Sequence, residues 1–562
     1  MKMLTFSSFF NRFGTVLFFF FLIPFSGVSQ QINRGAQVFD LNCANCHNFK
    51  EDGIGPQLGG LKGIVDKKYL LDFINDPKAL IDANVARAQD KYKKFKSYMP
   101  SFSHLDPKDL QDVIAYILEK PSPKNPDKKE KLALENPIRE GIQFSGETIH
   151  LKKVVKFPLT YTPQVNTRIN KMTFHPISKE RIISDLQGKI YILDEKNQLS
   201  EYVDISKHFP NFTNKPGFAT GLGSFAFHPL FAQNKLFYTT HTEPEIKGPS
   251  DFTYGDSLRV KLQWIITEWT LDSPSTKELS GKSREVMRVN VIDQVHGMQE
   301  ITFNPYAKLG DPDFGLLYIG LGDGGALEQR RGFIPNNSEH AWGKVLRIDP
   351  LGRNSQNGKY GIPASNPFVG KKGLDEVFAQ GFRNPNRISW LKDGRIIVSN
   401  IGQRHIESLY LLKAGKNYGW PLREGTFAID STMSTNTVFP LPKNDAKMGY
   451  TYPIAQFDHD EGNAMMGGFE YTGKAIPSLQ GKYIFGEIVR GRIFYIPISD
   501  IKEGTQTRIR ELKLQLDGLP VTLKELVKAN KVDLRFGQDA QGEIYIITKT
   551  DGMLYQIVPS LQ

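Results

Sequence analysis

The five residues Cys-Ala-Asn-Cys-His, at positions 43–47, constrain this chain most, because they include both of its cysteines. A disulfide across two intervening residues closes a strained ring that serves mainly in redox exchange. A zinc site needs two more ligands at suitable spacing, and the chain has no second cysteine pair. Cys-x-x-Cys-His is instead the attachment sequence of c-type haem. It predicts thioether bonds from Cys43 and Cys46 and proximal ligation of the haem iron by His47.

A haem iron of this type needs a second axial ligand, and Met99 is the candidate that we favour. A lone Met is usually core filler, but Met99 precedes Pro100 and follows the cysteine motif in the expected order. Met/His ligation raises the reduction potential of the iron. His104, a little further along the chain, is the alternative ligand. The carbonyl of Pro56 is predicted to accept a hydrogen bond from the second ring nitrogen of His47.

The sequence after this Met predicts a helix that begins after Asp106, with a Pro in its first turn. Apolar residues then recur at the spacing of one helix face. Gly35 and Phe39, one turn apart, are expected to pack against this face near Tyr116. The whole segment 31–120 resembles a class I cytochrome c, and the resemblance implies a small all-α domain.

The N-terminus is typical of an export signal. Lys2 and Arg12 precede an apolar run, 16–25, and small residues near Ser29 suit a cleavage site. The run is too short for a convincing membrane-spanning helix, although an uncleaved anchor is the alternative. A lipoprotein anchor is not expected, because no cysteine lies near Ser29. Residues 1–29 are therefore predicted to be the signal peptide of an exported, periplasmic or secreted protein without stable membrane insertion.

The chain has a net charge of +11, but its lysines are scattered and no nucleic-acid-binding motif accompanies them. We therefore interpret the charge as solvated surface and linker, and expect no nucleic-acid partner. Residues 121–150 begin with a stretch that is rich in Pro and Lys and lacks sustained periodicity. They are predicted to form a semi-extended linker.

Residues 151–562 have a different texture, in which short runs rich in Val, Ile, Tyr and Phe alternate with Gly, Asp and Asn turns. A turn of the aromatic-x-Pro or Asp-Gly type followed by an apolar strand recurs about six times. These units predict a β-propeller, because radial repetition protects strand edges. A large array of β-sandwiches is the alternative. The predicted fold class is a multidomain protein, a small all-α cytochrome c domain followed by an all-β six-bladed propeller.

Several phrases in this segment go beyond a generic propeller: GLGSFAFHP (221–229), HGMQEITFNP (296–305), GLLYIGLGDGG (315–325), GKVLRIDPLG (343–352), GFRNPNRISW (381–390) and GKNYGWP (415–421). In this order they resemble the soluble glucose and sorbosone dehydrogenases, six-bladed propellers that use pyrroloquinoline quinone (PQQ) and calcium. The resemblance covers most of residues 160–557. Vertebrate hedgehog-interacting proteins share the scaffold without the reaction, so the resemblance identifies the fold better than the catalysis.

The resemblance implies a catalytic pair, His296 and Asp323. His296 aligns with the general base that removes the proton of the sugar C1 hydroxyl, a task that suits a neutral imidazole. Asp323 aligns with the carboxylate that orients and stabilises the protonated base. By residue type alone, a lone His is more often a core or turn residue. Asp323, flanked by glycines, also suits a plain turn.

The resemblance also implies a PQQ site. Arg383 and Asn384 match an Arg-Asn pair at the cofactor, where the Arg hydrogen-bonds the quinone oxygen that gains negative charge. The alternative for Arg383 is to anchor a loop between blades. Arg490 and Arg535 are further candidates for PQQ binding. The chain departs from the family here, because Val489 replaces a cofactor-binding Lys and Arg535 alone remains of an Arg-x-Arg. PQQ carries three carboxylates, so missing cations weaken its case.

Calcium is implied by the segment that follows. The backbone carbonyls of Gly402 and Gln403 match the ligands of the ion that polarises PQQ, and oxygen ligands suit this hard cation. Glu407 and the carbonyl of Tyr418 are candidates for a second, structural calcium. Ala219 replaces the Gln that faces the substrate in glucose-oxidising members, which leaves sugar specificity open.

Three functions follow from these features. The first is an exported quinoprotein that oxidises a small-molecule sugar or polyol, reduces its own c-type haem and then a downstream electron acceptor. The second is a glycan- or protein-binding propeller without dehydrogenase activity, fused to an electron-transfer cytochrome. The third is an electron carrier with a structural propeller. A fused haem suits a two-electron donor whose electrons must leave singly, and this favours the first function.

Overall fold

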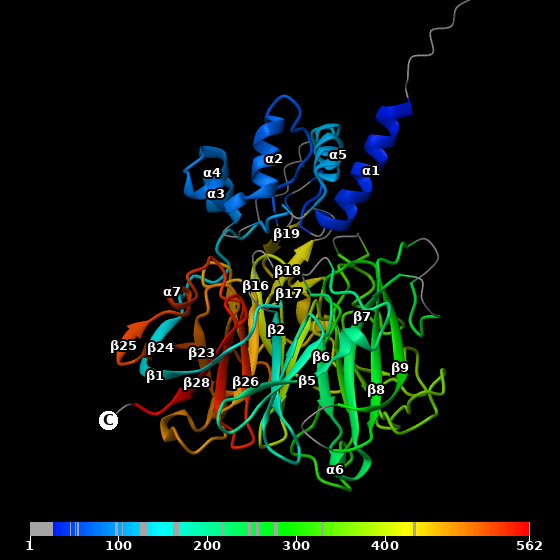
Figure 1. Cartoon of the computed structure of the whole chain (residues 1–562), viewed down its shortest axis with the longest axis vertical. Helices are drawn as coiled ribbons and strands as arrows, with labels where there is room; N and C mark the ends of the chain where they lie inside the picture. The colour runs from blue at the N-terminus through cyan, green and yellow to red at the C-terminus, as the bar shows by residue number, and fades with distance from the viewer. Residues whose placement is uncertain are drawn as a thin grey trace, which may run out of the picture.

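The computed structural model shows a small helical unit resting on a larger, strand-rich unit (Figure 1). The structure describes residues 26–44, 46–50, 52, 55–95, 99–103, 105–123, 133–160, 168–215, 219–245, 249–254, 258–274, 279–327, 331–430 and 434–560. Most of the predicted signal segment and the alternative haem ligand His104 therefore lie outside the described residues.

The helical unit contains the haem motif, and its last helix begins as predicted. The Asp106 side chain accepts a hydrogen bond from the backbone N–H of Lys108 at 2.7 Å. Helices α1 and α5 cross closely at Gly35, where a Cβ atom would lie 2.1 Å from the backbone oxygen of Asp112. The helices of this unit are α1 Ser26–Asn42, α2 Lys67–Asn75, α3 Pro77–Asp82, α4 Ala86–Phe95 and α5 Pro107–Leu118.

Aromatic packing between α1 and α5 confirms another prediction. The ring centroids of Phe39 and Tyr116 lie 5.7 Å apart, and the Phe49 ring contacts both. These rings adjoin an apolar core that belongs to the helical unit alone, as expected for a separate domain. From α5 this core receives Leu110, Val113, Ile114, Ile117 and Leu118.

Both ends of this unit differ from the predicted boundaries. Helix α1 begins inside the predicted signal segment 1–29. Strand β1, Gln143–Lys156, begins inside the predicted linker 121–150 and pairs with strands β24 and β28 of the strand unit. The strand is hard to recognise because Ile149 and Leu151 are its only fully buried residues. No helix in the described part of the chain is long and apolar enough to cross a membrane.

Three sheets of the strand unit have four antiparallel strands each. The first contains β6 Ser224–Phe227, β7 Leu236–Pro244, β8 Leu262–Leu271 and β9 Gly281–Val291. The second contains β10 Met298–Phe303, β11 Leu317–Leu321, β12 Lys344–Ile348 and β13 Val377–Gln380. The third contains β14 Pro385–Trp390, β15 Ile396–Asn400, β16 Ile406–Leu411 and β20 Ala455–Asp458. A large apolar cluster fills the space between the first two sheets.

A 13-stranded sheet has the order β21-β22-β23-β24-β1-β28-β27-β26-β2-β3-β4-β5, with β25 paired to β24. The joins of β24 to β1 and of β26 to β2 are parallel, whereas the other pairs are antiparallel. Its strands are β2 Ile169–Phe174, β3 Arg181–Asp185, β4 Lys189–Leu193, β5 Leu199–Asp204, β21 Met465–Glu470, β22 Lys482–Glu487, β23 Ile493–Pro497, β24 Arg510–Leu516, β25 Leu519–Val521, β26 Leu534–Gln538, β27 Ile544–Thr548 and β28 Met553–Val558.

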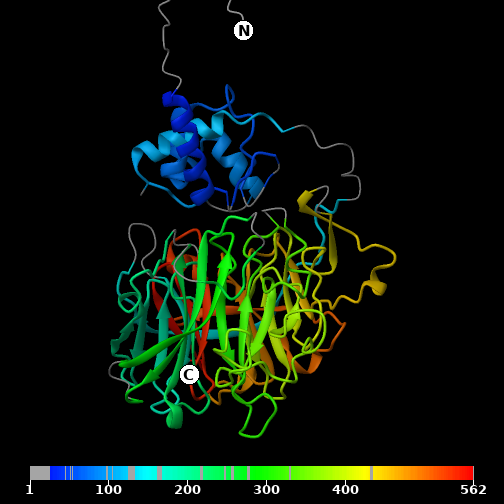
Figure 2. The ribbon, with the colours of Figure 1, turned by 90° about the vertical axis from the view of Figure 1, so that its right-hand side faces the viewer.

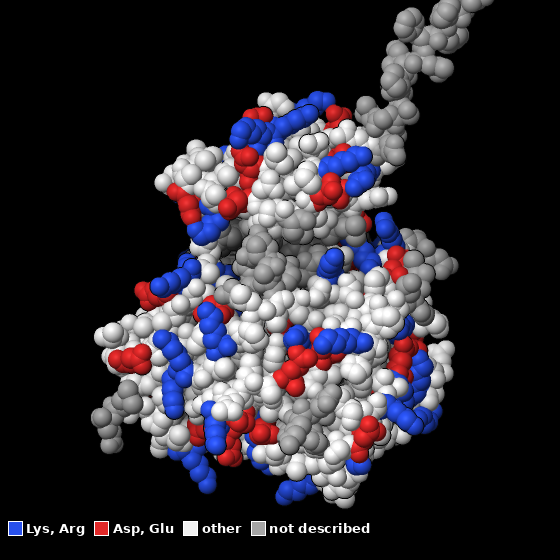
Figure 3. Space-filling view, viewed as in Figure 1, with Lys and Arg blue, Asp and Glu red and all other residues white. Residues whose placement is uncertain are grey.

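A small sheet of β17 Arg423–Glu424, β18 Phe427–Asp430 and β19 Ser434–Phe439 stands at the same end of the strand unit as the helical unit (Figures 1 and 2). Two short helices, α6 Phe231–Asn234 and α7 Leu523–Val527, complete the unit. The large unit is therefore mostly β, as predicted, whereas the number of blades stays a prediction. On the face in Figure 3, Lys and Arg are interspersed with Asp and Glu, which agrees with reading the net charge as solvated surface.

Candidate functional site

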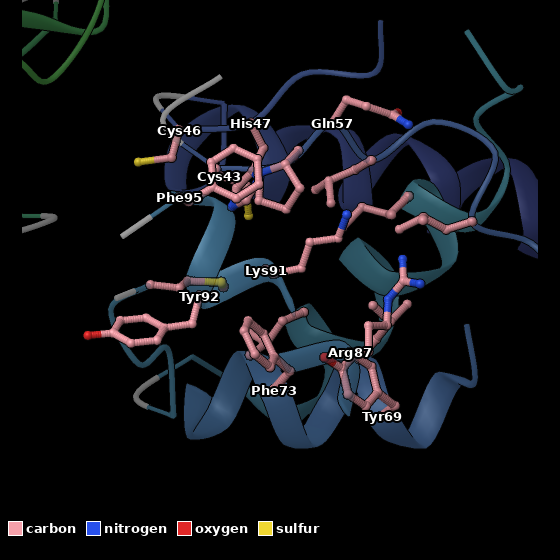
Figure 4. Close-up of a pocket in the computed structure, with 18 of the residues that line it drawn as sticks. Cys43, Cys46, His47, Gln57, Tyr69, Phe73, Arg87, Lys91, Tyr92 and Phe95 are labelled. Atoms are coloured by element: carbon pink, nitrogen blue, oxygen red, sulfur yellow. The ribbon is translucent and has the colours of Figure 1, made fainter. Parts of the chain in front are cut away.

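The helical unit contains an apolar pocket in which the predicted haem residues Cys43, Cys46, His47 and Met99 come together. In Figure 4, both cysteines and His47 lie at one side of the pocket, opposite side chains of α2. Two thiols, a ring nitrogen and a thioether within apolar walls fit a covalently attached haem. The walls contributed by α2 and α4 are Tyr69, Leu70, Phe73, Ile74, Arg87, Lys91, Tyr92 and Phe95.

His47 is held in the orientation that an iron ligand requires. Its Nδ1 donates a hydrogen bond to the backbone oxygen of Pro56 at 2.7 Å, as predicted, which leaves Nε2 to face the metal. Burial lowers the pKa of His47, so the ring is neutral, the form that binds metals. A Cβ atom at Gly55 would lie 2.2 Å from the His47 ring, so this close approach of the loop requires glycine.

Neither cysteine is in a disulfide, which removes that alternative for the motif. Burial raises the pKa of the Cys43 thiol to about 12, so this thiol stays protonated and is a poor redox nucleophile. Met99 packs against the core of the helical unit beside the pocket. The two cysteines and Met99 are therefore available for the roles predicted from the sequence.

The predicted pair of the strand unit is also formed. The His296 Nδ1 donates to Asp323 Oδ1 at 2.8 Å, which leaves Nε2 to accept a proton. Asp323 is fully buried and also accepts hydrogen bonds from the Gly325 N–H at 3.0 Å and from Trp420 Nε1 at 2.9 Å. Burial acts to raise the pKa of Asp323, but the hydrogen bond and charge of His296, with the charge of Arg383, outweigh it and lower that pKa. The carboxylate is therefore ionised.

The backbone around His296 is strained. His296 has a φ of +53°, in the left-handed region that non-glycine residues rarely adopt and that often marks functional sites. A Cβ atom at Gly297 would lie 1.8 Å from Trp264 Nε1, and one at Gly322 would lie 2.3 Å from the His296 oxygen. These glycines let the strained turn pack tightly, whereas the positive φ of His296 itself has no signature in the sequence.

Arg383 joins this pair to the predicted calcium loop. Its backbone oxygen accepts a hydrogen bond from the Asp323 N–H at 2.8 Å. Its guanidinium donates to Gln403 Oε1 at 2.6 Å and to the Gly402 oxygen at 2.8 Å. The neighbouring Asn384 shares the Asn400 side chain with Arg383 through backbone N–H bonds of 2.9 and 3.0 Å. Predicted residues from separate loops thus meet in one buried network.

Of the two carbonyls proposed to bind calcium, that of Gly402 already accepts a hydrogen bond. The Gly402 oxygen accepts from Arg383, so a bound calcium would share it with a guanidinium. The proposed second-ion residue Glu407 accepts from the backbone N–H groups of Gly402 and Met465, at 3.2 and 2.8 Å, and interacts with His459 at 2.9 Å. One Glu407 oxygen, Oε2, therefore braces the loop at Gly402, and the other contacts His459.

Glu424 is a structural residue that sequence reasoning missed. One of its carboxylate oxygens accepts the backbone N–H groups of residues 403–406, at 2.6, 2.8, 3.0 and 3.1 Å. This buried carboxylate fixes the turn that presents Gly402 and Gln403. The side-chain hydroxyl of Tyr418, the other residue predicted for a second calcium, donates to the Leu411 backbone oxygen at 2.6 Å. A lone Glu in a loop carries no local signal of such a role.

The remaining PQQ candidates have partners within the protein. Arg490 donates to the backbone oxygens of Asp460 and Glu461 at 3.0 and 3.1 Å. Arg535 pairs with Asp533 at 2.8 Å. The Arg490 guanidinium therefore holds the backbone at residues 460–461.

A group of cations surrounds Asp533, and most of it was missed by sequence reasoning. Lys531 and Lys549 lie 3.5 and 3.7 Å from the carboxylate that Arg535 also contacts, and the charge of Arg168 acts on it as well. Burial acts to raise the pKa of Asp533, but these positive charges hold it well below its usual range. Burial and the neighbouring positive charges in turn lower the pKa of Lys549 well below its usual value. Arg168 directly precedes β2 and Lys549 directly follows β27, positions at strand ends where sequence periodicity is silent.

The position of Ala219 also has a compensating neighbour. The Gln299 side chain donates to the Ala219 oxygen at 3.2 Å. The amide of Gln299, in β10, therefore lies beside the position where glucose-oxidising members carry a Gln.

Comparisons with known proteins divide the chain in the same way. The sequence matches the family model described as Glucose / Sorbosone dehydrogenase over residues 168–530, and that of Cytochrome c over residues 32–120. The HIPL2 protein of Arabidopsis thaliana is 28% identical over 362 residues, which are 56% of this chain and 50% of HIPL2. The chain thus spans about half the length of this curated relative.

Two further proteins are similar to the strand unit. Quinoprotein glucose dehydrogenase B of Acinetobacter calcoaceticus is 24% identical, over 51% of this chain and 58% of that protein. A solved structure named glucose dehydrogenase superposes with a TM-score of 0.51 at 19% identity, over 73% of this chain and 99% of that one. At this identity the structural likeness concerns the fold alone.

Proposed function

The chain belongs to the glucose/sorbosone dehydrogenase family and carries a cytochrome c domain ahead of the matched region, and we propose that it is a quinoprotein sugar dehydrogenase. It oxidises a sugar-like alcohol or hemiacetal and passes the electrons to its own haem. The observation that carries this proposal is the single buried network of His296, Asp323, Arg383 and the loop 402–403.

We infer that the strand unit is a six-bladed propeller. The two parallel joins divide the main path of the 13-stranded sheet into three groups of four strands, beside the three separate four-stranded sheets. One strand from each group contacts its counterpart in the next group, in the order β2, β6, β10, β14, β21 and β26, and β26 contacts β2. Radial repetition of this kind characterises a propeller.

His296 acts as the general base in this proposal. Its Nδ1 donates to Asp323, so Nε2 takes the proton of the substrate hydroxyl, while a hydride leaves the carbon that bears this hydroxyl. The ionised Asp323 then stabilises the imidazolium that results. PQQ, when bound, supplies the quinone that accepts the hydride. Arg383 offers its guanidinium to the quinone oxygen, where negative charge develops.

The residues present fit PQQ through a changed set of cations. Val489 stands at the position of the family's cofactor-binding Lys, and the neighbouring Arg490 is already hydrogen-bonded to backbone oxygens. Beside Asp533, Lys531, Arg535 and Arg168 would provide positive charge for the carboxylates of PQQ, whereas burial and these neighbouring charges lower the pKa of Lys549 well below its usual value. Calcium is proposed at the Gly402 and Gln403 carbonyls, where the second lone pair of the Gly402 oxygen remains to be used.

The domain plan follows from these assignments. We propose a signal peptide at 1–29, the haem domain at 31–120, a linker that ends before β1, and the propeller to the end of the given chain. Such a protein acts outside the cytoplasm on a small-molecule sugar or polyol. Its haem then reduces a downstream electron acceptor.

A second candidate function is supported by the departures from the family. Ala219 and Val489 stand where the family carries a substrate-facing Gln and a cofactor-binding Lys. Neither position belongs to the haem domain, so electron transfer by the haem does not depend on them. A glycan- or protein-binding propeller fused to an electron-transfer cytochrome accounts for these losses.

The experiment that separates the two functions uses the purified haem-loaded protein. We would add PQQ, Ca²⁺ and a panel of aldoses, polyols and oligosaccharides, and follow the absorbance of reduced haem. The dehydrogenase predicts reduction that requires both PQQ and sugar and stops when Ca²⁺ is chelated. No reduction with any substrate would reject the dehydrogenase and leave the binding propeller.

A further inference from the structure

The loop that carries Gly402 and Gln403 also touches the helical unit. Arg404, the next residue, places its guanidinium 5.6 Å from the centre of the Phe95 ring. Phe95 ends α4 and lines the haem pocket (Figure 4). Because Arg383 binds both Gly402 and Gln403, one short segment connects the proposed quinone site with the wall of the haem pocket.

The charge of Arg404 lies beside the haem pocket. Its guanidinium packs against the ring of Phe95, which is part of the pocket wall. A positive charge this close also stabilises the reduced iron relative to the oxidised iron, so it raises the haem reduction potential. Arg404 therefore has an electrostatic effect on the haem site as well as a packing contact.

A second contact joins the units at α1. The Lys261 Nζ donates to the Asp40 backbone oxygen at 2.9 Å and lies 3.3 Å from the Asp40 carboxylate. On its other side it lies 3.8 Å from the Asp293 carboxylate, three residues before His296. The Lys261 side chain is only 5% exposed, so this cation is enclosed between the two units. Buried charge pairs of this kind fix orientation more than they add affinity.

The chain between the units is also attached to the strand unit. The Leu134 N–H donates to the Val438 oxygen at 3.0 Å, and the Ile138 N–H donates to the Asp458 carboxylate at 3.1 Å. These bonds shorten the free tether, which raises the effective concentration of the helical unit at this end of the strand unit.

We propose that Arg404 and Lys261 are positioning residues for electron transfer, which dock the haem pocket against the segment that binds Arg383. One contact lies on the residue next to Gln403, and the other involves Lys261, whose partner Asp293 precedes His296 by three residues. Together they fix both the distance and the orientation of the haem domain. This inference rests on the proposed function, because it concerns how electrons leave the same site.

The test uses the full protein loaded with haem, PQQ and Ca²⁺, and the variants Arg404→Met, Arg404→Lys and Lys261→Met. Sugar oxidation is measured twice, with a soluble dye that accepts electrons directly from the quinone site and by single-turnover reduction of the haem. The haem midpoint potential is measured separately by redox titration. Lys513→Met is the matched control, because Lys513 lies 5.6 Å from the Phe144 ring and both residues belong to the strand unit.

We expect Arg404→Met and Lys261→Met each to slow haem reduction about tenfold, equivalent to ~1.4 kcal/mol. The double variant should lose about a hundredfold, because distant contacts act additively. Reduction of the dye should stay within about twofold of the native rate, since no reacting group is changed. The midpoint potential should fall in Arg404→Met alone and be preserved in Arg404→Lys. The control Lys513→Met should match the native protein throughout.

Three outcomes overturn the inference. Unchanged haem reduction in both single variants shows that the contacts do not position the haem. An equal loss with the dye shows that Arg404 acts on the quinone site instead. If the native protein oxidises no sugar even with the dye, the proposed function itself fails, and the positioning role fails with it.

Discussion

The two candidate sites each hold a histidine by its Nδ1, but they obtain the partner in different ways. His47 donates to the backbone oxygen of Pro56, a near neighbour along the chain, inside a mostly apolar pocket. His296 donates to the carboxylate of Asp323, which is held in turn by Trp420 from a distant loop. One histidine is fixed by a neutral carbonyl and the other by a buried charge.

This difference suits two kinds of chemistry. A neutral partner lets His47 remain an uncharged metal ligand, which only has to keep its orientation. A buried carboxylate stabilises positive charge on His296, which a base must carry after it takes a proton. The haem site therefore depends on one small unit, whereas the base depends on loops from several sheets. Substitutions in either site should therefore change haem ligation or sugar oxidation separately.

The largest expected effect is that of His296→Ala on sugar oxidation. Loss of a general base typically costs 10²–10⁴-fold in rate, so sugar-dependent haem reduction should nearly cease. The haem absorption spectrum should not change, because His296 belongs to the strand unit. His150→Ala, in β1, is a control that should retain activity. A substantial rate in His296→Ala would remove the proposed base and with it the distinction between the two histidines.

Asp323→Asn should destabilise the strand unit by about 1.5–3 kcal/mol at neutral pH, because it removes a buried carboxylate that accepts hydrogen bonds from His296, Gly325 and Trp420. The folded-state pKa of Asp323 is lowered, so its contribution is complete above the usual carboxyl pKa, about 3.9, and is lost as the pH falls through the lower folded value. Denaturant unfolding at several pH values should show the two proteins converging in acid. A pH-independent difference would mean that the carboxylate is not ionised.

Met99→Ala tests the second axial ligand of the haem iron. Met99 is partly buried, so its removal should cost some stability, and loss of the thioether ligand should lower the midpoint potential and open the iron to external ligands. Binding of added imidazole, followed in the visible spectrum, measures the opening. An unchanged ligand-field spectrum would exclude Met99 and direct attention to His104.

The haem site could be predicted almost completely from the sequence because its chemistry lies in contiguous or closely spaced residues. The Cys-x-x-Cys-His motif, the carbonyl of Pro56 and the cap at Asp106 are all local, and the hydrogen bonds that they predict are present. The need for local signals also explains why β1 was included in the predicted linker. Strand β1 depends on distant partners, β24 and β28, and its own residues carry little alternation.

The strand unit could be predicted only where the family resemblance supplied positions. His296, Asp323 and Arg383 were expected to be close, but their shared network depends on non-local pairing that no local pattern encodes. Glu424 was missed because four backbone N–H groups bind it only after the loop has folded. Lys549 was missed because a cation after a strand resembles ordinary solvated surface.

Glu424→Gln should weaken the loop that presents Gly402 and Gln403. Hydrogen bonds to a charged group contribute about 1.5–3 kcal/mol, and the neutral amide also brings a donor into a site filled by N–H groups. We expect this loss in the unfolding free energy of the strand unit, together with weaker binding of PQQ measured by calorimetry. Glu195→Gln, at an exposed turn, is the control. Unchanged stability and PQQ binding would show that the loop does not depend on Glu424.

Gly55→Ala should have the smallest effect on stability and the most specific effect on the haem. The added Cβ would lie 2.2 Å from one carbon of the His47 ring and 2.8 Å from both ring nitrogens, so the ring or the loop must move. Overpacking of this kind costs about 1–3 kcal/mol. Because the Pro56 carbonyl orients the ring, displacement should weaken the bond between His47 and the iron and shift the haem spectrum.

Gly63→Ala is the matched control for this last substitution. Gly63 has a φ of +77° and no atom within 4 Å of an added Cβ, so Ala there is strained without touching His47. A left-handed non-glycine residue costs about 1–2 kcal/mol, close to the expected loss for Gly55→Ala. Similar stabilities with a changed haem spectrum only in Gly55→Ala would establish that His47 is positioned by its local loop. Equal spectra would show that the ring is held by the remainder of the pocket instead, and the contrast with His296 would disappear.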